Sequence, residues 1–263
     1  MVISLITDFG NSDYFTGVMK GVILSICPDI SIVDISHEIK PYNIAKAGFV
    51  LSKSYRFFPK GTVHLIVVDP GVGSSRKILI AQSPEHFFVM PDNGIISWIL
   101  KDEGAVKVYE LSDNTIYTNS PSATFHGRDI MAPVAAKIAS GMKPEDLGRI
   151  TKTFTTADIP VPKISGDKIE GEIIYCDHFG NLITNIRKED YEKIKETKRN
   201  SNVLIKVKDI DIEIISSSYS DVSDLKINAL WGSHGNLELF AKEANAGRIS
   251  GINMGTLVEI LFR

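Results

Sequence analysis

The stretch TVHLIVVDPGVGSSR, residues 62–76, decides the fold of this chain and points to a site. Its first seven residues are short, β-branched and nearly all apolar, which predicts a buried strand of a parallel sheet. The strand ends at Asp69, and ligands of open α/β sheets bind where such strands end. Pro70 and the glycines after it favour an unusual turn around that carboxylate. The same residues are also typical of an ordinary turn, with Asp69 and Arg76 as a surface ion pair.

The sequence around this stretch alternates strand and helix patterns. Two strand and helix pairs precede the Asp69 strand: Val2–Ile6 with a helix that Pro28 stops, and Ile30–Ile35 with a helix over residues 44–55. They make two βαβ-like units, which predict a largely parallel sheet. Further elements are expected after this strand, with strands at Lys77–Ala81, Phe87–Met90 and Val106–Leu111 and helices over 93–100 and 129–140.

The pattern changes around Lys152–Asp167, where Thr, Pro and Gly replace the periodic apolar residues. Beyond it, short and often alternating runs predict the strands of a small antiparallel barrel or sandwich: Gly171–Tyr175, Leu182–Ile186, Val203–Lys208, Asp211–Ile215, Leu237–Phe240 and Thr256–Phe262. One helix is expected there, over Lys188–Lys198, with a solvated charged face. We therefore predict an α/β fold with an N-terminal α/β domain over residues 1–160 and a smaller C-terminal β domain over residues 168–263.

The composition is that of an ordinary globular protein of 263 residues, with 43% hydrophobic and 23% charged residues. A formal net charge of −3 gives no electrostatic reason to expect nucleic acid or a membrane as a partner. No apolar run approaches the roughly 20 residues of a membrane span, and the N-terminus lacks a signal-peptide pattern, so we expect a cytoplasmic protein. Cys27 and Cys176 stand far apart without a CxxC neighbour, which favours buried thiols over a zinc or redox site.

Polar residues gather where two strands of the first half end. Asp8 follows the first strand as Asp69 follows a later one, and Asp13 lies in the polar loop beyond it. A carboxylate placed there can accept two hydrogen bonds from a vicinal diol such as that of ribose. A helix cap or Asx-turn is the alternative for Asp8 and Asp13, and is favoured for Asp13 taken alone. The run FHGRD, residues 125–129, adds His126 beside a helix entry.

Two polar runs interrupt the apolar strands of the second half. Hairpin-turn chemistry explains only part of the run YCDHFGNLITN, residues 175–185. The residues it leaves unexplained could bind a base, with an aromatic ring to stack on its face and amides to pair with its edge: Asp177, Phe179, Asn181 and Asn185. In WGSHGNLE, residues 231–238, Ser233 and its neighbouring N–H groups could hold a carboxylate, with a plain turn as the alternative.

Several familiar sites are not supported. The glycine-rich turn after Asp69 lacks the Gly-Lys-Ser/Thr spacing of a P-loop, and the first strand lacks GxGxxG. The sequence holds no GxSxG, HExxH or His-x-His pattern, which argues against a serine hydrolase or a typical zinc enzyme.

Five motifs, taken in order, resemble the S-adenosylmethionine hydrolase (adenosine-forming) family, a relative of the fluorinases and chlorinases: TDFG (7–10), VDPGVG (68–73), PDNG (91–94), FHGRD (125–129) and DHFGN (177–181). They span nearly the whole chain. The resemblance implies an N-terminal α/β domain, a C-terminal β-barrel domain, and a homotrimer with active sites between neighbouring subunits. It also implies that water attacks the ribose 5′ carbon of S-adenosylmethionine, a small-molecule substrate, and releases adenosine and methionine without a cofactor or metal.

The resemblance also assigns roles to individual residues. Asp69, Arg76 and His126 would handle the water, and Asp69 favours hydrolysis because the halogenating relatives carry another side chain there. Asp8 would hold the ribose hydroxyls, and Asn181 the adenine. We also keep Asp13, from the loop beyond Asp8, among the residues expected to bind the substrate. The remaining nucleoside and methionine contacts would come from Asp177, Ser233 and Glu238. We also expect Phe179 and Asn185 of the polar run, and Ala241, to bind the substrate. After Glu238 this chain reads LFAKE, residues 239–243, where the family usually continues toward Ala-Val-Asn.

Three other functions stay open. The first is a halide-dependent adenosyl transferase that uses the same substrate. The second is an adenosine or S-adenosylmethionine binding protein without catalysis. The third is a metal-dependent hydrolase, since carboxylates and imidazoles at strand ends can gather a cation; its candidate ligands are Asp8, Asp13, His37, Asp69 and His126.

Overall fold

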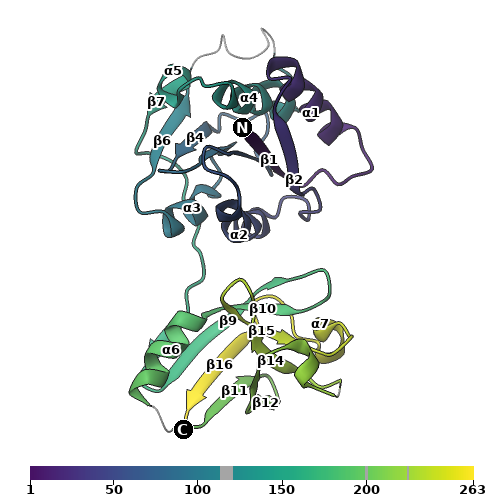
Figure 1. Cartoon of the computed structure of the whole chain (residues 1–263), viewed down its shortest axis with the longest axis vertical. Helices are drawn as coiled ribbons and strands as arrows, with labels where there is room; N and C mark the ends of the chain where they lie inside the picture. The colour runs from purple at the N-terminus through teal and green to yellow at the C-terminus, as the bar shows by residue number, and fades with distance from the viewer. Residues whose placement is uncertain (113–120, 199–200, 224) are drawn as a thin grey trace. The chain divides into compact units, whose positions relative to one another are not determined.

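The computed structural model describes residues 1–112, 121–198, 201–223 and 225–263. The chain divides into two compact units, Met1–Ile159 and Pro160–Arg263, each with its own sheet and core (Figure 1). The first unit is α/β and the second is built on a strongly curved β-sheet, so the predicted fold class is confirmed. Among the described residues, no helix has both the length and the apolar character that crossing a membrane requires.

The first unit is built on one mixed sheet. Its strands are β1 (Val2–Thr7), β2 (Ser31–Ser36), β3 (Val63–Val67), β4 (Ile78–Gln82), β5 (Phe87–Pro91), β6 (Lys107–Leu111) and β7 (Gly148–Ile150). Their order is β2-β1-β3-β5-β4-β6-β7. The first four in this order run parallel, as predicted, whereas β4, β6 and β7 are paired antiparallel.

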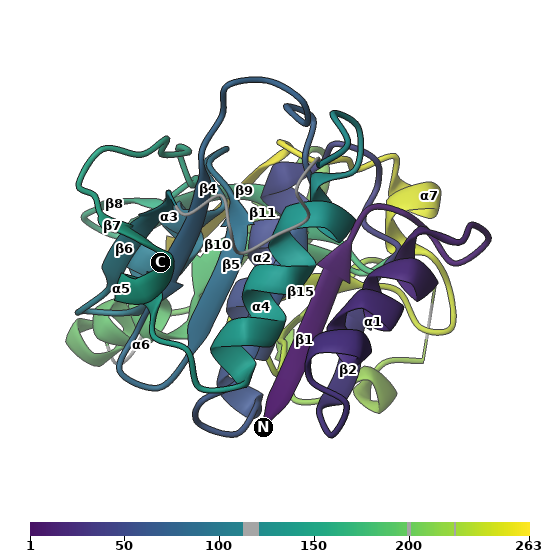
Figure 2. The same ribbon diagram turned by 90° about the horizontal axis from the view of Figure 1, so that it is seen from above.

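Helices cover both faces of this sheet (Figure 2). On one face lie α1 (Phe15–Ile26) and α4 (Ala132–Ala139), and on the other lie α2 (Ile44–Ser54) and α3 (Ile96–Asp102), while the short α5 (Pro144–Leu147) precedes β7. Side chains alternate across a strand, so Leu65 and Val67 enter the core beneath α1 and α4, whereas Ile66 and Val68 enter the other core. The apolar run before Asp69 therefore serves two layers, which explains why it carries no polar alternation.

The helix expected over residues 129–140 begins differently. A single π-helical turn, Gly127–Met131, precedes α4 and buries Gly127 against the Val67 side chain. Such turns place one extra residue in the helix, often at a functional site, and sequence periodicity does not resolve them. Asp129 lies inside this turn, where it pairs with Arg128 and accepts a hydrogen bond from the Ser122 backbone N–H.

The second unit is a nearly closed, barrel-like sheet around its own apolar core. Its strands are β8 (Lys163–Ser165), β9 (Lys168–Cys176), β10 (Leu182–Arg187), β11 (Val203–Val207), β12 (Ile210–Ile212), β13 (Ile215–Ser216), β14 (Asn228–Trp231), β15 (Asn236–Phe240) and β16 (Leu257–Phe262). They are ordered β12-β11-β16-β9-β10-β15-β14-β13, with β8 beside β9. Neighbours are antiparallel except for β13 and β14.

Several details differ from the sequence prediction. The expected strand over Asp211–Ile215 is split into β12 and β13, and β14 was not predicted. The helix α6 (Lys188–Thr197) is confirmed, but a second helix, α7 (Ala246–Ser250), follows β15. Its five residues are too few to show helical periodicity. Finally, the Cys27 and Cys176 thiols are half-buried rather than buried.

Candidate active site

A pocket of about 310 Å³ lies at the carboxyl ends of β1 and β3. These strands pair in parallel with Thr7 opposite Val67, so the chain leaves the sheet at neighbouring points to form the two loops that start with Asp8 and Asp69. The side chains of Asp8, Asp69 and His126 all line this pocket. The structure therefore brings together residues from three separate motifs of the first half.

Arg76 contacts both of the other residues assigned to water handling. Its Nε donates to Asp69 Oδ1 at 2.7 Å, and its Nη2 donates to Asp69 Oδ2, so the guanidinium holds the carboxylate through two hydrogen bonds. The same Nη2 lies 2.8 Å from His126 Nδ1. The Asp69 and Arg76 side chains are only 6% and 9% exposed. The ion pair exists, but it is largely desolvated rather than the surface pair considered from the sequence.

The Arg76 contact fixes the tautomer of His126. A guanidinium can only donate, so Nδ1 must accept, and the neutral imidazole then carries its proton on Nε2. Partial burial lowers the pKa of His126, and the Arg76 charge lowers it further, against an opposing effect of Asp69 and Asp129. At neutral pH His126 is therefore a neutral N–H donor, suited to orienting a water molecule.

Asp8 is held by the loop that follows β2. Its Oδ2 accepts a hydrogen bond from the Tyr42 backbone N–H at 2.9 Å. Burial raises the pKa of Asp8, and the nearby Asp69 carboxylate also raises it, whereas the Tyr42 N–H lowers it. The Oδ1 atom can still accept from a ligand hydroxyl. Asp13 is exposed in the loop before α1 and is not among the residues that line the pocket.

Aromatic side chains form the apolar wall of the same pocket. The rings of Phe9, Phe15 and Phe125 lie between 5.2 and 5.7 Å apart, centroid to centroid. Beside carboxylates and an imidazole, such a wall excludes bulk water and strengthens the electrostatic interactions inside the pocket. The pocket combines a dry surface with a few directed polar atoms.

The glycine-rich turn after Asp69 packs against the segment that leads to His126. Gly73 has a φ of +80°, and a Cβ atom there would lie 2.4 Å from the Ala123 carbonyl oxygen. Only glycine satisfies both conditions. Gly71 does not adopt a positive φ, so the unusual backbone expected at both glycines occurs only at Gly73.

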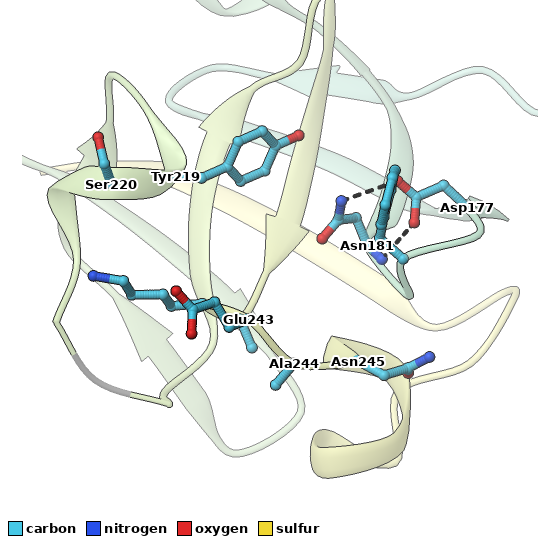
Figure 3. A pocket seen from close by; sticks show the side chains of 10 residues that line it. Asp177, Asn181, Tyr219, Ser220, Glu243, Ala244 and Asn245 are labelled. Carbon is cyan, nitrogen blue, oxygen red and sulfur yellow. Dashed lines mark hydrogen bonds between the residues drawn. The ribbon is translucent and has the colours of Figure 1, made fainter.

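A second pocket, of about 750 Å³, lies in the C-terminal unit (Figure 3). It is bordered by the turn between β9 and β10, by a short 3-10 turn at Tyr219–Asp221, and by the segment that follows β15. Of the predicted residues, Asp177, Phe179, Asn181 and Ala241 line it. The polar run that hairpin chemistry left unexplained therefore does face a cavity.

Asp177 and Asn181 are joined by two hydrogen bonds (Figure 3). Asp177 Oδ1 accepts from the Asn181 backbone N–H at 2.8 Å, and Oδ2 accepts from Asn181 Nδ2 at 2.9 Å. A carboxylate only accepts, so the amide must present its nitrogen to Asp177. Asn181 Oδ1 therefore points away from Asp177 and can accept a hydrogen bond from a ligand.

Phe179 stands at the edge of this pocket with its side chain 76% exposed, whereas Ala241 is 5% exposed. An exposed ring beside a cavity is suited to stacking on a flat ligand. The segment after Ala241, in which this chain departs from the family pattern, also borders the pocket through Lys242, Glu243 and Asn245.

Three other predicted residues do not line this pocket. Asn185 is buried in β10, where its Oδ1 accepts from the Glu172 backbone N–H at 2.8 Å. Ser233 is exposed in the loop between β14 and β15. Glu238 is buried in β15 and accepts hydrogen bonds from Tyr219 and His234. Their contacts with a ligand stay predictions.

Sequence reasoning missed Tyr219, which lines the second pocket. It lies in the run SSSYSD, residues 216–221, whose serines and aspartate indicate a turn. That signal locates a loop but does not indicate what the tyrosine in it contacts.

Of the residues considered as metal ligands, Asp8, Asp69 and His126 line the pocket, whereas Asp13 and His37 do not. Among the described residues, no group of three or more His, Cys, Asp or Glu side chains could hold an ion. His37, one of the candidates, lies with its Nδ1 2.9 Å from Thr7 Oγ1 and its Nε2 3.0 Å from Asp34 Oδ1. It supports the end of β1 rather than the pocket, whose lining does not include it.

Comparison with known proteins gives the chain a family. The model of the SAM hydroxide adenosyltransferase N-terminal domain matches residues 3–148, and that of the C-terminal domain matches residues 171–259. An (R)-S-adenosyl-L-methionine hydrolase from Methanocaldococcus jannaschii is 32% identical over 273 residues, which cover 99% of this chain and 96% of that protein. A fluorinase from Actinoplanes sp. is 28% identical, over 73% of this chain and 74% of its own length.

A solved structure agrees with these matches. An uncharacterized conserved protein from Thermotoga maritima superimposes with a TM-score of 0.91 at 32% identity, and the match covers 99% of this chain and 100% of that one. The resemblance drawn from the five motifs is confirmed. The chain belongs to the SAM hydroxide adenosyltransferase family.

Proposed function

We propose that this protein hydrolyses S-adenosyl-L-methionine to adenosine and L-methionine. The observation that carries this proposal is the Asp69 carboxylate, which Arg76 holds through two hydrogen bonds at the wall of an apolar pocket. A carboxylate in such surroundings can orient a water molecule and accept its proton. The names of the hydrolase relatives support the same reaction.

The water attacks the ribose 5′ carbon. Asp69 accepts a hydrogen bond from the water, and His126 Nε2–H donates one to its oxygen. Arg76 keeps both side chains in place, because it contacts both of them. Positioned acid and base groups of this kind typically accelerate a reaction by about 10²–10⁴-fold. We therefore assign orientation of the water to His126 and proton acceptance to Asp69.

The leaving group needs no acid. The new carbon–oxygen bond forms as the bond between C5′ and sulfur breaks, and the electron pair of that bond returns to the sulfonium, which leaves as the neutral thioether of methionine. The water loses one proton, which passes to Asp69 and then to solvent. In-line alignment of water, carbon and sulfur is therefore the main requirement, and holding the reactants in this geometry supplies much of the acceleration.

The remaining polar groups bind the nucleoside. Asp8 Oδ1 accepts from the ribose hydroxyls, Asn181 Oδ1 accepts from the exocyclic amine of adenine, and Phe179 stacks on the base. The proposal includes a homotrimer with active sites between neighbouring subunits, a reaction without a metal or cofactor, and a cytoplasmic location. Because a fluorinase is among the relatives, a halide-dependent transfer is the second candidate. Asp69 disfavours it, since a residue that takes up a proton from water has no such role when a halide attacks.

The test is to incubate the purified protein with S-adenosylmethionine, with and without EDTA, and to separate the products by chromatography against a protein-free control. We expect equal amounts of adenosine and methionine in both samples. Bound adenosine without any turnover would instead support the binding-protein alternative. Loss of activity in EDTA would support the metal-dependent one, and a 5′-halogenated adenosine formed in added chloride or fluoride would support the transferase.

A further inference from the structure

Glu238 lies behind the wall of the C-terminal pocket rather than in it. Its side chain belongs to β15 and is 3% exposed. Burial of a carboxylate is costly unless its oxygens are hydrogen-bonded. Both oxygens are: Oε1 accepts from the Tyr219 hydroxyl at 2.5 Å, and Oε2 lies 3.0 Å from His234 Nε2. The acid is therefore fully committed to two neighbouring side chains.

His234 is oriented to donate to this carboxylate. The backbone N–H of Asn236 donates to His234 Nδ1 at 3.2 Å, which leaves Nε2 as the protonated nitrogen of the neutral ring. His234 thus fixes the second oxygen of Glu238. The first oxygen is then directed at Tyr219, the other donor in contact with it.

Tyr219 is the pocket residue in this set. Its ring lines the cavity (Figure 3) and packs edge to face on Phe240, with 5.0 Å between the ring centroids. Burial raises the pKa of Tyr219, and its hydrogen bond to Glu238 raises it further, so the hydroxyl remains a donor at every physiological pH. The hydroxyl is therefore anchored to β15 while one side of the ring borders the cavity.

The turn that carries Tyr219 is fixed at its backbone as well. Asp221 Oδ2 accepts from the backbone N–H groups of Ser217 and Ser218, both at 2.9 Å, and its Oδ1 accepts from the Ser218 hydroxyl at 2.8 Å. The bond from the Ser218 N–H is one half of a capping box, and the other half is the Asp221 backbone N–H, which donates to the Ser218 side chain. The hydrogen bonds of Asp221 fix the backbone of the turn but not the orientation of the Tyr219 ring. That orientation is set by the contacts of the ring with Glu238 and Phe240.

We propose that Glu238 is a positioning residue that acts through Tyr219: it holds the ring in place as a preformed wall for the flat base of the nucleoside. This inference rests on the proposed function for the identity of the ligand, and differs from it in making Glu238 an indirect participant rather than a substrate contact. Preformed pockets bind more tightly because fewer groups must be ordered on binding. The effect is expected in affinity, and the chemical step should be spared.

A double-mutant cycle tests this directly. The dissociation constant for adenosine is measured by calorimetry for the wild-type protein, Tyr219→Phe, Glu238→Leu and the double variant, and kcat and KM are measured with S-adenosylmethionine. A hydrogen bond to a charged group contributes about 1.5–3 kcal/mol, so each single change should weaken adenosine binding by about tenfold or more. At saturation kcat should stay within about twofold. The double variant should bind little worse than either single one, because both remove the same contact.

Two further variants separate positioning from a general loss of stability. Glu238→Gln keeps both contacts, because its amide oxygen can accept from His234 Nε2–H while its amide nitrogen donates to the Tyr219 hydroxyl oxygen. It should restore adenosine affinity to within about threefold of the wild type. It also keeps the test valid if Glu238→Leu does not fold. Tyr191→Phe is the matched control, since this half-buried tyrosine of the same unit packs on Trp231 and Phe262 and does not line the pocket. Its adenosine affinity should not change.

The possible failures are distinct. Additive losses of adenosine affinity in the double variant would mean that Glu238 contacts the ligand itself, and would overturn the proposal. The same conclusion would follow if Glu238→Gln bound adenosine as weakly as Glu238→Leu while Tyr219→Phe bound it as the wild type does. Unchanged affinity in Glu238→Leu would overturn it as well. A wild-type protein that binds no adenosine would overturn both this inference and the proposed function.

Discussion

The two pockets of this chain differ in what their carboxylates contact. In the N-terminal pocket the Asp69 carboxylate and the Arg76 cation are paired at the wall, beside the imidazole of His126. In the C-terminal region two carboxylates, Asp177 and Glu238, are committed to an amide and to a phenol. In the first pocket the carboxylate is thus placed to take part in a reaction, whereas in the second region the carboxylates orient neutral side chains that would contact a base. We expect substitutions in the first pocket to change turnover and those in the second to change affinity.

The largest effect should come from Asp69→Asn. The amide keeps the shape of the carboxylate but cannot take up a proton from water, so turnover should fall by about 10²-fold or more. The dissociation constant for adenosine, measured by calorimetry, should stay within about threefold. Asp13→Asn is the control, because Asp13 is exposed and does not line the pocket. Full turnover of the Asp69 variant would remove this residue from the reaction.

His126→Ala should lower turnover by at least about tenfold, since it removes the donor that orients the water. The pH dependence follows from the sign of the pKa shift. Burial and the Arg76 charge lower the pKa of His126. The ring therefore stays neutral as the pH falls from 8 to about 6.5, the ordinary pKa of histidine. At lower pH, protonation would place a positive charge on His126 beside the Arg76 guanidinium, and the repulsion would displace the imidazole.

A profile of kcat/KM against pH checks this second prediction. The wild-type protein should show a plateau above pH of about 6.5 and an acidic decline that begins below it. His126→Gln, which keeps an N–H donor without titrating, should retain part of the activity and lose that decline. An acidic limb that begins well above the ordinary histidine value would contradict the assigned tautomer.

Asn181 should decide which base is accepted. Its Oδ1 can only accept, because Nδ2 is bound to Asp177. Adenosine offers an amine to this oxygen, whereas inosine, of nearly the same shape, offers a carbonyl. We expect the wild-type protein to bind adenosine about tenfold more tightly than inosine, and Asn181→Leu to lose most of this preference. Equal binding of the two nucleosides by the wild-type protein would show that the amide does not read the base.

The smallest effect is expected for Phe179→Ala. Aromatic stacking contributes about 0.5–1.5 kcal/mol, so adenosine binding should weaken by about two- to tenfold, with kcat unchanged. Because the Phe179 side chain is 76% exposed, the melting temperature should not change. Phe179→Tyr, which keeps the ring, should bind as the wild type does. A lower kcat of Phe179→Ala would contradict the proposal that the second pocket affects affinity and not turnover.

The sequence predicted best what depends on neighbours along the chain. Asp69 and Arg76 lie seven residues apart in one loop, and the polar run containing Asp177 and Asn181 folds back on itself over four residues. Their pairing follows from local turn chemistry. The strand before Asp69 was equally clear, because it is apolar on both faces.

What the sequence did not predict depends on distant contacts. Tyr219 lies 19 residues from Glu238, and nothing in a serine-rich turn indicates that its hydroxyl reaches a buried strand. The antiparallel pairing of β4 with β5 is set by the sheet and not by either strand alone. The desolvation of the Asp69 and Arg76 pair depends on packing against the segment before His126, 50 residues further along.

The central claim is that water attacks the ribose 5′ carbon, and an oxygen-labelling experiment tests it most directly. The protein is incubated with S-adenosylmethionine in water enriched in oxygen-18, and adenosine and methionine are analysed by mass spectrometry. The account predicts one labelled oxygen in the 5′-hydroxyl of adenosine and none in methionine. Adenosine released without the label would contradict it, because its 5′ oxygen would then not derive from the water.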